Sequence, residues 1–402
     1  MPEKFFDGGG STVDLNIRYQ IPHINQYLYA KADMRNIPLG GTFELTPMCN
    51  MNCRMCYVHL DQKQMPERLL TVYEWIQIAE AAKEKGLLFL LLTGGEPFLR
   101  EDFKEIYLKL HQMGFVLSVN TNGTLITEKE VSWLKEAAPI RINITVYGAS
   151  NDTYDQLCGN PRGYDQVMKA IHLLKEAGIE VKLNYSLTPY NAGDFYEIKK
   201  MSLREGLFLQ ATTYMYPPLR KGRENIGKND RVSPEEAAYY TALSHYYEYG
   251  PEQFLKGTEE KNLVHECMDR VLSDSHSESG KREHLRCHAG MSTFWVTWNG
   301  RMTPCGMMDQ PAVSIREKGF SEAWNEVGRQ TRKILMPEKC TSCIYKKRCS
   351  TCAAMVLAET GGFEKAPAYR CHMIESYPEA CRKLRQQIIR HELKEDVWIN
   401  EK

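Results

Sequence analysis

A helix-like segment that stops at a glycine and leads into an apolar strand recurs four times between residues 41 and 213. This repeat constrains the possible folds more than any other feature of the chain. The glycines are Gly86, Gly114, Gly178 and Gly206, each at the position where a helix usually ends. Strands that alternate with helices predict βα units around a parallel sheet or barrel, with six strands visible instead of eight.

The expected strands are short and apolar, and they cover residues 42–46, 87–93, 115–121, 140–146, 180–187 and 207–212. The helices expected between them cover residues 72–85, 103–113, 128–137, 164–177 and 194–204. Thr71 and Thr127 are predicted N-caps, and Glu130 completes a capping box with Thr127. Because a parallel sheet carries its chemistry where the strands end, we expect the site at their carboxyl ends.

Thirteen cysteines are the unusual part of an ordinary composition. Lys and Arg (51) balance Asp and Glu (51), so no net charge draws the chain to nucleic acid or to an anionic membrane. The N-terminus has no apolar signal-peptide core, and the longest apolar run is too short to span a membrane. We therefore expect a cytoplasmic protein whose clustered cysteines bind iron–sulfur clusters or metal, because secreted disulfide scaffolds are short.

The first cluster has the spacing C-x3-C-x2-C and comprises Cys49, Cys53 and Cys56. Three thiolates on one short loop can bind three irons of a four-iron cluster and leave the fourth iron open to another ligand. One apolar helix face would also produce this spacing. The nearby Pro47 and two asparagines favour a loop.

Polar residues and glycines follow the next three expected strands. The stretches are LTGGEP (92–97), NTNG (120–123) and TVYGAS (145–150). Glycines allow a close backbone approach to a ligand, and Glu96 adds a charged acceptor. Together these strand ends predict a ring of ligand-binding groups around a barrel mouth.

With these motifs, residues 41–213 resemble the radical S-adenosylmethionine (SAM) superfamily. The resemblance rests on Cys49, Cys53, Cys56 and the GGEP stretch of residues 94–97. It implies an α/β fold with a partial (β/α)6 TIM-type barrel. It also implies a [4Fe–4S] cluster that reductively cleaves SAM to methionine and a 5′-deoxyadenosyl radical, which abstracts a hydrogen atom from the substrate.

The resemblance also implies which residues bind SAM. The GGEP stretch would hold the amino group, and Asn120, Asn122 and Thr145 are candidates for the ribose or carboxylate. The family often has an aromatic residue just before the third cysteine. This chain has Met55 there and Tyr57 just after it, so Tyr57 is the candidate for adenine packing. The implied SAM-binding residues are Gly94, Gly95, Glu96, Pro97, Tyr57, Asn120, Asn122 and Thr145.

The tail contains a C-x2-C-x5-C-x2-C run with further cysteines on both sides, and it resembles the seven-cysteine SPASM extension of radical SAM enzymes. That pattern usually has three residues between its last paired cysteines, and this chain has two. The resemblance implies two auxiliary [4Fe–4S] clusters. One would be held by Cys340, Cys343, Cys349 and Cys371, and the other by Cys287, Cys305 and Cys352.

Several points about the cysteines stay open. The fourth ligand of the second auxiliary set could be Cys267, the substrate, water or nothing. Zinc is an alternative for the paired tail cysteines, although two zinc knuckles are usually farther apart. Cys158 and Cys381 are expected to be plain thiols.

The expected organisation is an N-terminal extension (1–40), the radical SAM barrel (41–230), a helical linker (231–285), a small cysteine-rich SPASM domain (286–375) and a C-terminal helix (376–402). Residues 233–250 and 378–394 look helical, and residues 269–283 look like a mobile linker. We expect the tail to be held by its clusters more than by apolar packing.

The leading functional hypothesis is post-translational modification of a ribosomally made peptide or protein. The expected partners are the peptide substrate, an electron donor such as flavodoxin or ferredoxin, and a separate leader-peptide-binding protein. Alternatives are anaerobic sulfatase maturation, small-molecule cofactor biosynthesis and a non-catalytic iron–sulfur electron carrier. Sulfatase-maturing enzymes place an Asp directly after the second tail cysteine, where this chain has Gly306; Asp309 is a weak catalytic candidate.

Overall fold

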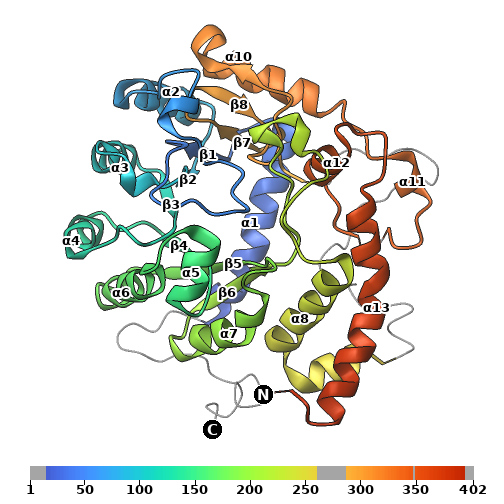
Figure 1. Ribbon diagram of the computed structural model, residues 1–402. Coiled ribbons are helices and arrows are strands. Elements are labelled where there is room, and N and C mark those ends of the chain that lie inside the picture. The colour runs from blue at the N-terminus through green and yellow to red at the C-terminus, as the bar shows by residue number, and fades with distance from the viewer. Residues whose placement is uncertain (1–14, 260–286, 347–348, 394–402) are drawn as a thin grey trace.

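The protein is described by a computed structural model that covers residues 15–259, 287–346 and 349–393 (Figure 1). The side chains of residues 15–23 are not described. Cys267 and the linker expected at 269–283 lie outside the described residues.

The core is one nine-stranded sheet with the order β6-β5-β4-β3-β2-β1-β7-β8-β9. Its first six strands are parallel neighbours in chain order, as the repeat of βα units predicted. Their bounds are β1 Gly40–Glu44, β2 Phe89–Thr93, β3 Val116–Thr121, β4 Arg141–Val146, β5 Val181–Ser186 and β6 Phe208–Thr212. The partial parallel barrel is therefore confirmed.

Helices follow the strands and lie along the outer side of the curved sheet (Figure 1). They are α2 Val72–Glu84, α3 Phe103–Gln112, α4 Glu128–Glu136, α6 Gly163–Glu176 and α7 Phe195–Arg204. Thr71 and Thr127 form the expected capping boxes with Glu74 and Glu130. The four glycines of the repeat all have positive φ, the conformation that ends a helix in this way. A further helix, α5 Asn151–Cys158, follows β4 and was not expected.

The tail continues the barrel sheet. Strand β7 (Thr293–Val296) pairs in parallel with the free edge of β1, and β8 (Arg301–Thr303) and β9 (Val313–Ser314) add antiparallel strands. Phe294 of β7 and Trp324 of α10 (Ile315–Thr331) are buried in the same core as the barrel. The expectation that clusters rather than apolar packing hold the tail is wrong for this part, because its apolar side chains cover the β1 edge.

Two long helices lie side by side beyond the barrel (Figure 1). Helix α8 (Pro234–Gly257) extends past the expected end at residue 250 with a kink at Gly250, whose φ is 83°. Helix α13 (Ala368–Ile389) begins at Ala368 instead of residue 378 and so includes Cys371. The remaining helices are α1 Leu15–Arg35, α11 Glu338–Thr341 and α12 Ala353–Thr360.

Short 3-10 turns connect these elements: η1 Gln62–Gln64, η2 Pro97–Leu99, η3 Ala192–Asp194, η4 Leu219–Lys221 and η5 Arg223–Asn225. Within the described residues, no helix is both long and apolar enough to cross a membrane.

Candidate active site

The three front cysteines lie on an irregular loop between β1 and α2, so the helix-face alternative is wrong. We call residues 46–58 the front loop. Its backbone contacts the end of α5, since Asn52 N–H donates to the Cys158 carbonyl at 2.9 Å and Arg54 N–H to Leu157 at 3.0 Å. The end of helix α5, which was not expected, therefore holds the front loop through backbone hydrogen bonds next to its cysteines.

The front thiols lie close enough to influence one another. Burial, followed by the nearby Glu96, Cys53 and Cys56, raises the pKa of the Cys49 thiol to about 12. Cys158 lies within hydrogen-bonding reach of Cys53, so this thiol, expected to be unrelated, borders the site. Iron binding would replace the thiol protons, and its positive charge would stabilise the thiolates that burial and the neighbouring groups disfavour.

The donor set fits a cluster in which each thiolate binds its own iron. Among the described residues, no three His, Cys, Asp or Glu side chains converge as a single metal ion requires. A four-iron cluster needs no such convergence, because its thiolates sit on separate irons. Cys49, Cys53 and Cys56 would hold it at the carboxyl end of β1.

The structure explains why the GGEP stretch needs a glycine at residue 95, which the sequence alone did not show. Gly95 N–H donates to the Thr46 carbonyl at 2.6 Å, and Glu96 N–H donates to the Met48 carbonyl at 2.9 Å. A Cβ added at Gly95 would lie 2.2 Å from the Met48 oxygen. Only glycine lets the end of β2 approach the front loop this closely.

The Glu96 carboxylate is fully buried and already satisfied by the chain. It accepts hydrogen bonds from Thr121 Oγ1 (2.8 and 2.9 Å), Asn122 N–H (2.7 Å) and Phe98 N–H (3.0 Å). Burial nevertheless raises the pKa of Glu96 to about 7. Glu96 therefore ties β2 to the end of β3. The predicted contact with the SAM amino group then falls to the main chain of residues 94–97, and it stays a prediction.

The other predicted SAM-binding residues lie around the strand ends. Asn122 donates to Asn50 Oδ1 at 2.9 Å and contacts Cys49 Sγ at 3.7 Å, so it orients the front loop. Asn120 accepts from Asn143 at 2.8 Å, and Thr145 is half-buried on β4. Their contacts with SAM stay predictions.

Sequence reasoning missed a buried ion pair between β1 and η4, to which Trp295 of the tail also bonds. Glu44 of β1 is 0% exposed, and its carboxylate accepts from Arg220 at 2.6 and 2.8 Å and from Trp295 Nε1 at 2.8 Å. Arg220 belongs to η4 and Trp295 to β7, so three distant segments meet here. The available signal was a carboxylate between the apolar Phe43 and Leu45 in the middle of an expected strand.

Tyr57 lies beside this ion pair. Burial raises its pKa, and the charged or ionisable groups that act on it are Arg220, Glu44, Cys56 and Cys305. Because Cys305 belongs to the tail, Tyr57 is the part of the front loop that comes close to a tail thiol. Its predicted contact with adenine stays a prediction.

The tail thiols influence one another in two groups. Cys287 and Cys352 act on Cys305, and Tyr216 Oη lies 3.6 Å from Cys352 Sγ. Separately, Cys349, Cys371 and Cys343 act on Cys340. These groups match the two sets that the resemblance implied, while their roles as cluster ligands stay predictions.

Asp309, the catalytic candidate, is near the tail side of this region. Its Oδ2 accepts from Arg223 at 3.2 Å, and its buried Oδ1 has no partner within the described residues. Its catalytic role also stays a prediction.

A parallel sheet with a three-cysteine loop after its first strand and a glycine turn after its second defines the class. Residues 43–201 match the model of the radical SAM superfamily. The protein is a radical SAM enzyme, a class that uses SAM and a [4Fe–4S] cluster, and its relatives are consistent with the SPASM type.

The chain is similar to characterised proteins over most of its length. It is 28% identical to the AdoMet-dependent heme synthase of Methanosarcina barkeri, over 84% of this chain and 97% of that relative. It is 27% identical to the PqqA peptide cyclase of Rhizobium meliloti, over 80% and 84%. The fold resembles Streptococcus suis SuiB bound to precursor peptide SuiA, with a TM-score of 0.61 and 16% identity over 91% and 84% of the two chains.

Proposed function

We propose that this enzyme abstracts a hydrogen atom from a peptide or protein during its post-translational modification. The observation that carries the radical chemistry is the front loop, whose three cysteines lie against the GGEP turn at the carboxyl ends of β1 and β2. Similarity to a peptide cyclase supports a peptide as the substrate. So does the fold shared with a protein solved with its precursor peptide.

The chain's own contribution is to hold and orient. When bound, the front cluster and SAM supply the 5′-deoxyadenosyl radical. Cys49, Cys53 and Cys56 hold the cluster, and Asn122 and the Gly95 main chain keep the loop in place. The buried position of Cys53 keeps water away from this ligand.

The substrate would bind between the front loop and the tail thiols of Cys287, Cys305 and Cys352. Tyr57 and Arg220 lie there, with Cys56 on one side and Cys305 on the other. An electron donor such as flavodoxin or ferredoxin would reduce the front cluster, and the auxiliary clusters held by the tail cysteines would accept an electron from the substrate radical. A separate leader-binding protein would present the peptide.

The test is anaerobic incubation of the reduced, iron-loaded protein with SAM and short peptides encoded beside its gene. We expect 5′-deoxyadenosine together with a mass change in one peptide. Deoxyadenosine without any change in a peptide or protein would contradict the proposed substrate class. No deoxyadenosine from fully loaded protein would contradict the radical chemistry itself.

One observation favours a second candidate, small-molecule cofactor biosynthesis. The similarity to the M. barkeri heme synthase extends over 97% of that protein. The same assay with an iron-tetrapyrrole precursor would then release haem, detected by mass spectrometry, and leave all peptides unchanged.

Sulfatase maturation has less support. A Cβ at Gly306 would lie 2.8 Å from the Trp295 ring, so the Asp expected at this position in those enzymes would need Trp295 to move. Asp309 is instead paired with Arg223.

A further inference from the structure

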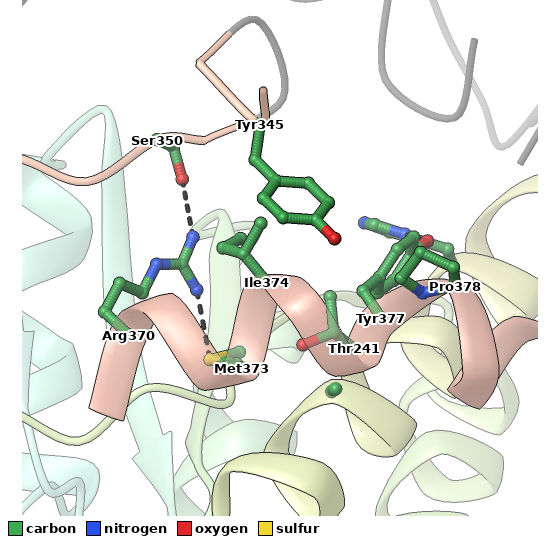
Figure 2. A pocket seen from close by; sticks show the side chains of 10 residues that line it. Thr241, Tyr345, Ser350, Arg370, Met373, Ile374, Tyr377 and Pro378 are labelled. Atoms are coloured by element: carbon green, nitrogen blue, oxygen red, sulfur yellow. Dashed lines mark hydrogen bonds between the residues drawn. The ribbon is translucent and has the colours of Figure 1, made fainter. Parts of the chain in front are cut away.

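A cavity lies far along the chain from the front loop, between α8, α13 and the segment that carries Tyr345 and Ser350 (Figure 2). Its volume is about 170 Å³. None of its lining residues comes from the strand ends that form the candidate active site.

Arg370 provides the charge of this cavity. The residue is 7% exposed and lies in the first turn of α13. Its Nη2 donates to Ser350 Oγ at 2.9 Å and its Nη1 to the Met373 sulfur at 3.0 Å (Figure 2). Its Nε–H has no acceptor within the described part of the chain. The Ser350 hydroxyl and the Met373 thioether are both neutral, so neither compensates the positive charge of the buried guanidinium.

Three other arginines whose side chains are largely buried have carboxylate partners. The pairs are Arg100 with Asp102, Arg220 with Glu44, and Arg231 with Glu359. Burying a guanidinium is costly unless a nearby anion compensates it. Arg370 has no such group among the described residues, which points to an anion from outside the chain.

The cysteines expected to hold the auxiliary cluster are not among the residues that line this cavity. Cys371 follows Arg370 directly, so its side chain leaves the helix about 100° further round. Burial raises the pKa of the Cys371 thiol, and Lys339 lowers it in part. Arg370 is one of the residues that line the cavity, with its guanidinium turned toward Ser350 and Met373 (Figure 2).

The rest of the lining suits an organic body. Met373, Ile374 and Pro378 present apolar surface, and Tyr345 adds an aromatic ring (Figure 2). A guanidinium binds a carboxylate through two parallel N–H bonds, whereas the apolar walls would disfavour a fully hydrated inorganic ion.

We propose that this cavity binds a carboxylate carried on an apolar or aromatic body, with Arg370 as the residue that pairs the carboxylate. The site is separate from the radical chemistry and does not depend on the proposed function. The carboxylate belongs either to a free organic acid or to the C-terminus of a peptide.

Calorimetric titration of the anaerobic, iron-loaded protein tests the site. The probes are benzoate, its neutral counterpart benzamide, inorganic phosphate, and a short peptide ending in Phe with a free or an amidated C-terminus. We expect benzoate to bind about 10-fold more tightly than benzamide or phosphate. If the peptide with a free C-terminus binds more tightly than benzoate and than its own amide, the carboxylate belongs to a peptide C-terminus. If benzoate binds more tightly than the free peptide, the carboxylate belongs to a free organic acid.

Two substitutions locate the binding. Arg370→Gln should weaken benzoate binding about 10-fold, and Ile374→Trp should block it by filling the cavity while Arg370 remains. Arg390→Gln, an exposed arginine near the end of the same helix, is the matched control and should leave binding unchanged. Equal affinity for benzoate and benzamide in the wild-type protein would overturn the proposal, whether or not the variants fold. So would undiminished benzoate binding in a folded Arg370→Gln or Ile374→Trp protein.

Discussion

The front loop and the tail both gather cysteines, but they do so in different ways. In the front loop, residues 49–56 supply all three thiols, and the neighbouring strand ends hold that single segment. In the tail, thiols from residue 287 to residue 371 meet only because β7 pairs with β1 and α13 packs on α8. A local motif can therefore be recognised from spacing, whereas a dispersed one depends on the fold around it.

The two regions are also joined. Glu44, Arg220 and Trp295 connect β1, η4 and β7 through buried hydrogen bonds. At the surface, Glu74 of α2 bonds to Arg316 of α10. The four predictions below separate front-loop effects from tail effects and from effects on the junction.

The largest difference is expected between cysteines of the two regions. Cys53→Ala should abolish 5′-deoxyadenosine formation, because the front cluster loses a ligand. Cys371→Ala should remove about four irons per chain while SAM cleavage persists. Iron analysis and nucleoside chromatography check both variants. If the two variants lost nucleoside formation equally, the division between front and auxiliary clusters would be wrong.

A smaller but still severe effect is expected from Gly95→Ala. The new Cβ would collide with the Met48 carbonyl and displace the front loop, so we expect about a 100-fold slower SAM cleavage. Gly193→Ala is the matched control, because no atom lies within 4 Å of its added Cβ and its φ is not positive. Wild-type rates for Gly95→Ala would show that the loop tolerates the displacement.

The third prediction concerns the buried pair of Glu44 and Arg220, and the quantity measured is the free energy of unfolding. Removing one partner of the buried pair, as in Glu44→Gln or Arg220→Met, should lower the free energy of unfolding by about 3–5 kcal/mol. The double variant should recover part of that loss, because no buried charge is then left alone. Denaturant titration of all four proteins measures this coupling. Strictly additive losses would mean that Glu44 and Arg220 do not stabilise the protein as a pair.

The smallest effect concerns pH. Arg68, with Thr71, holds the pKa of Glu74 at about 2, below its ordinary value of 4.5. A lowered pKa adds stability above pH 4.5 that is lost as the pH falls toward 2. Since Glu74 is at the surface and its pairs are screened, Glu74→Gln should cost only about 1 kcal/mol at pH 7. Urea titrations from pH 7 to pH 3 should show this gap narrowing, and a constant gap would contradict the assignment.

Much of the barrel was predictable because its signals are local. Apolar runs, N-caps such as Thr71 and stop glycines such as Gly86 each act within one turn of chain. The expected strand bounds agree with β1–β6 to within two residues. Helix α5 was missed although Ser150 caps its start and Gly159 ends it, because its eight residues are too few to show a clear apolar period.

The site was only partly predictable for the same reason. The spacing of Cys49, Cys53 and Cys56 identified the front loop. The reason for Gly95 became visible only when Met48 was placed against it. The tail was misjudged, because its apolar residues show their purpose only beside the open edge of β1.

The sequence by itself determined the class of chemistry, since three cysteines and a glycine turn at fixed spacing carry it within single loops. Tertiary structure alone decided the partners of the buried charges. Glu44 meets Arg220 across 176 positions of chain, and Arg370 meets no carboxylate among the described residues. Such pairings depend on which surfaces exclude water once the whole chain has packed, and no local pattern records that.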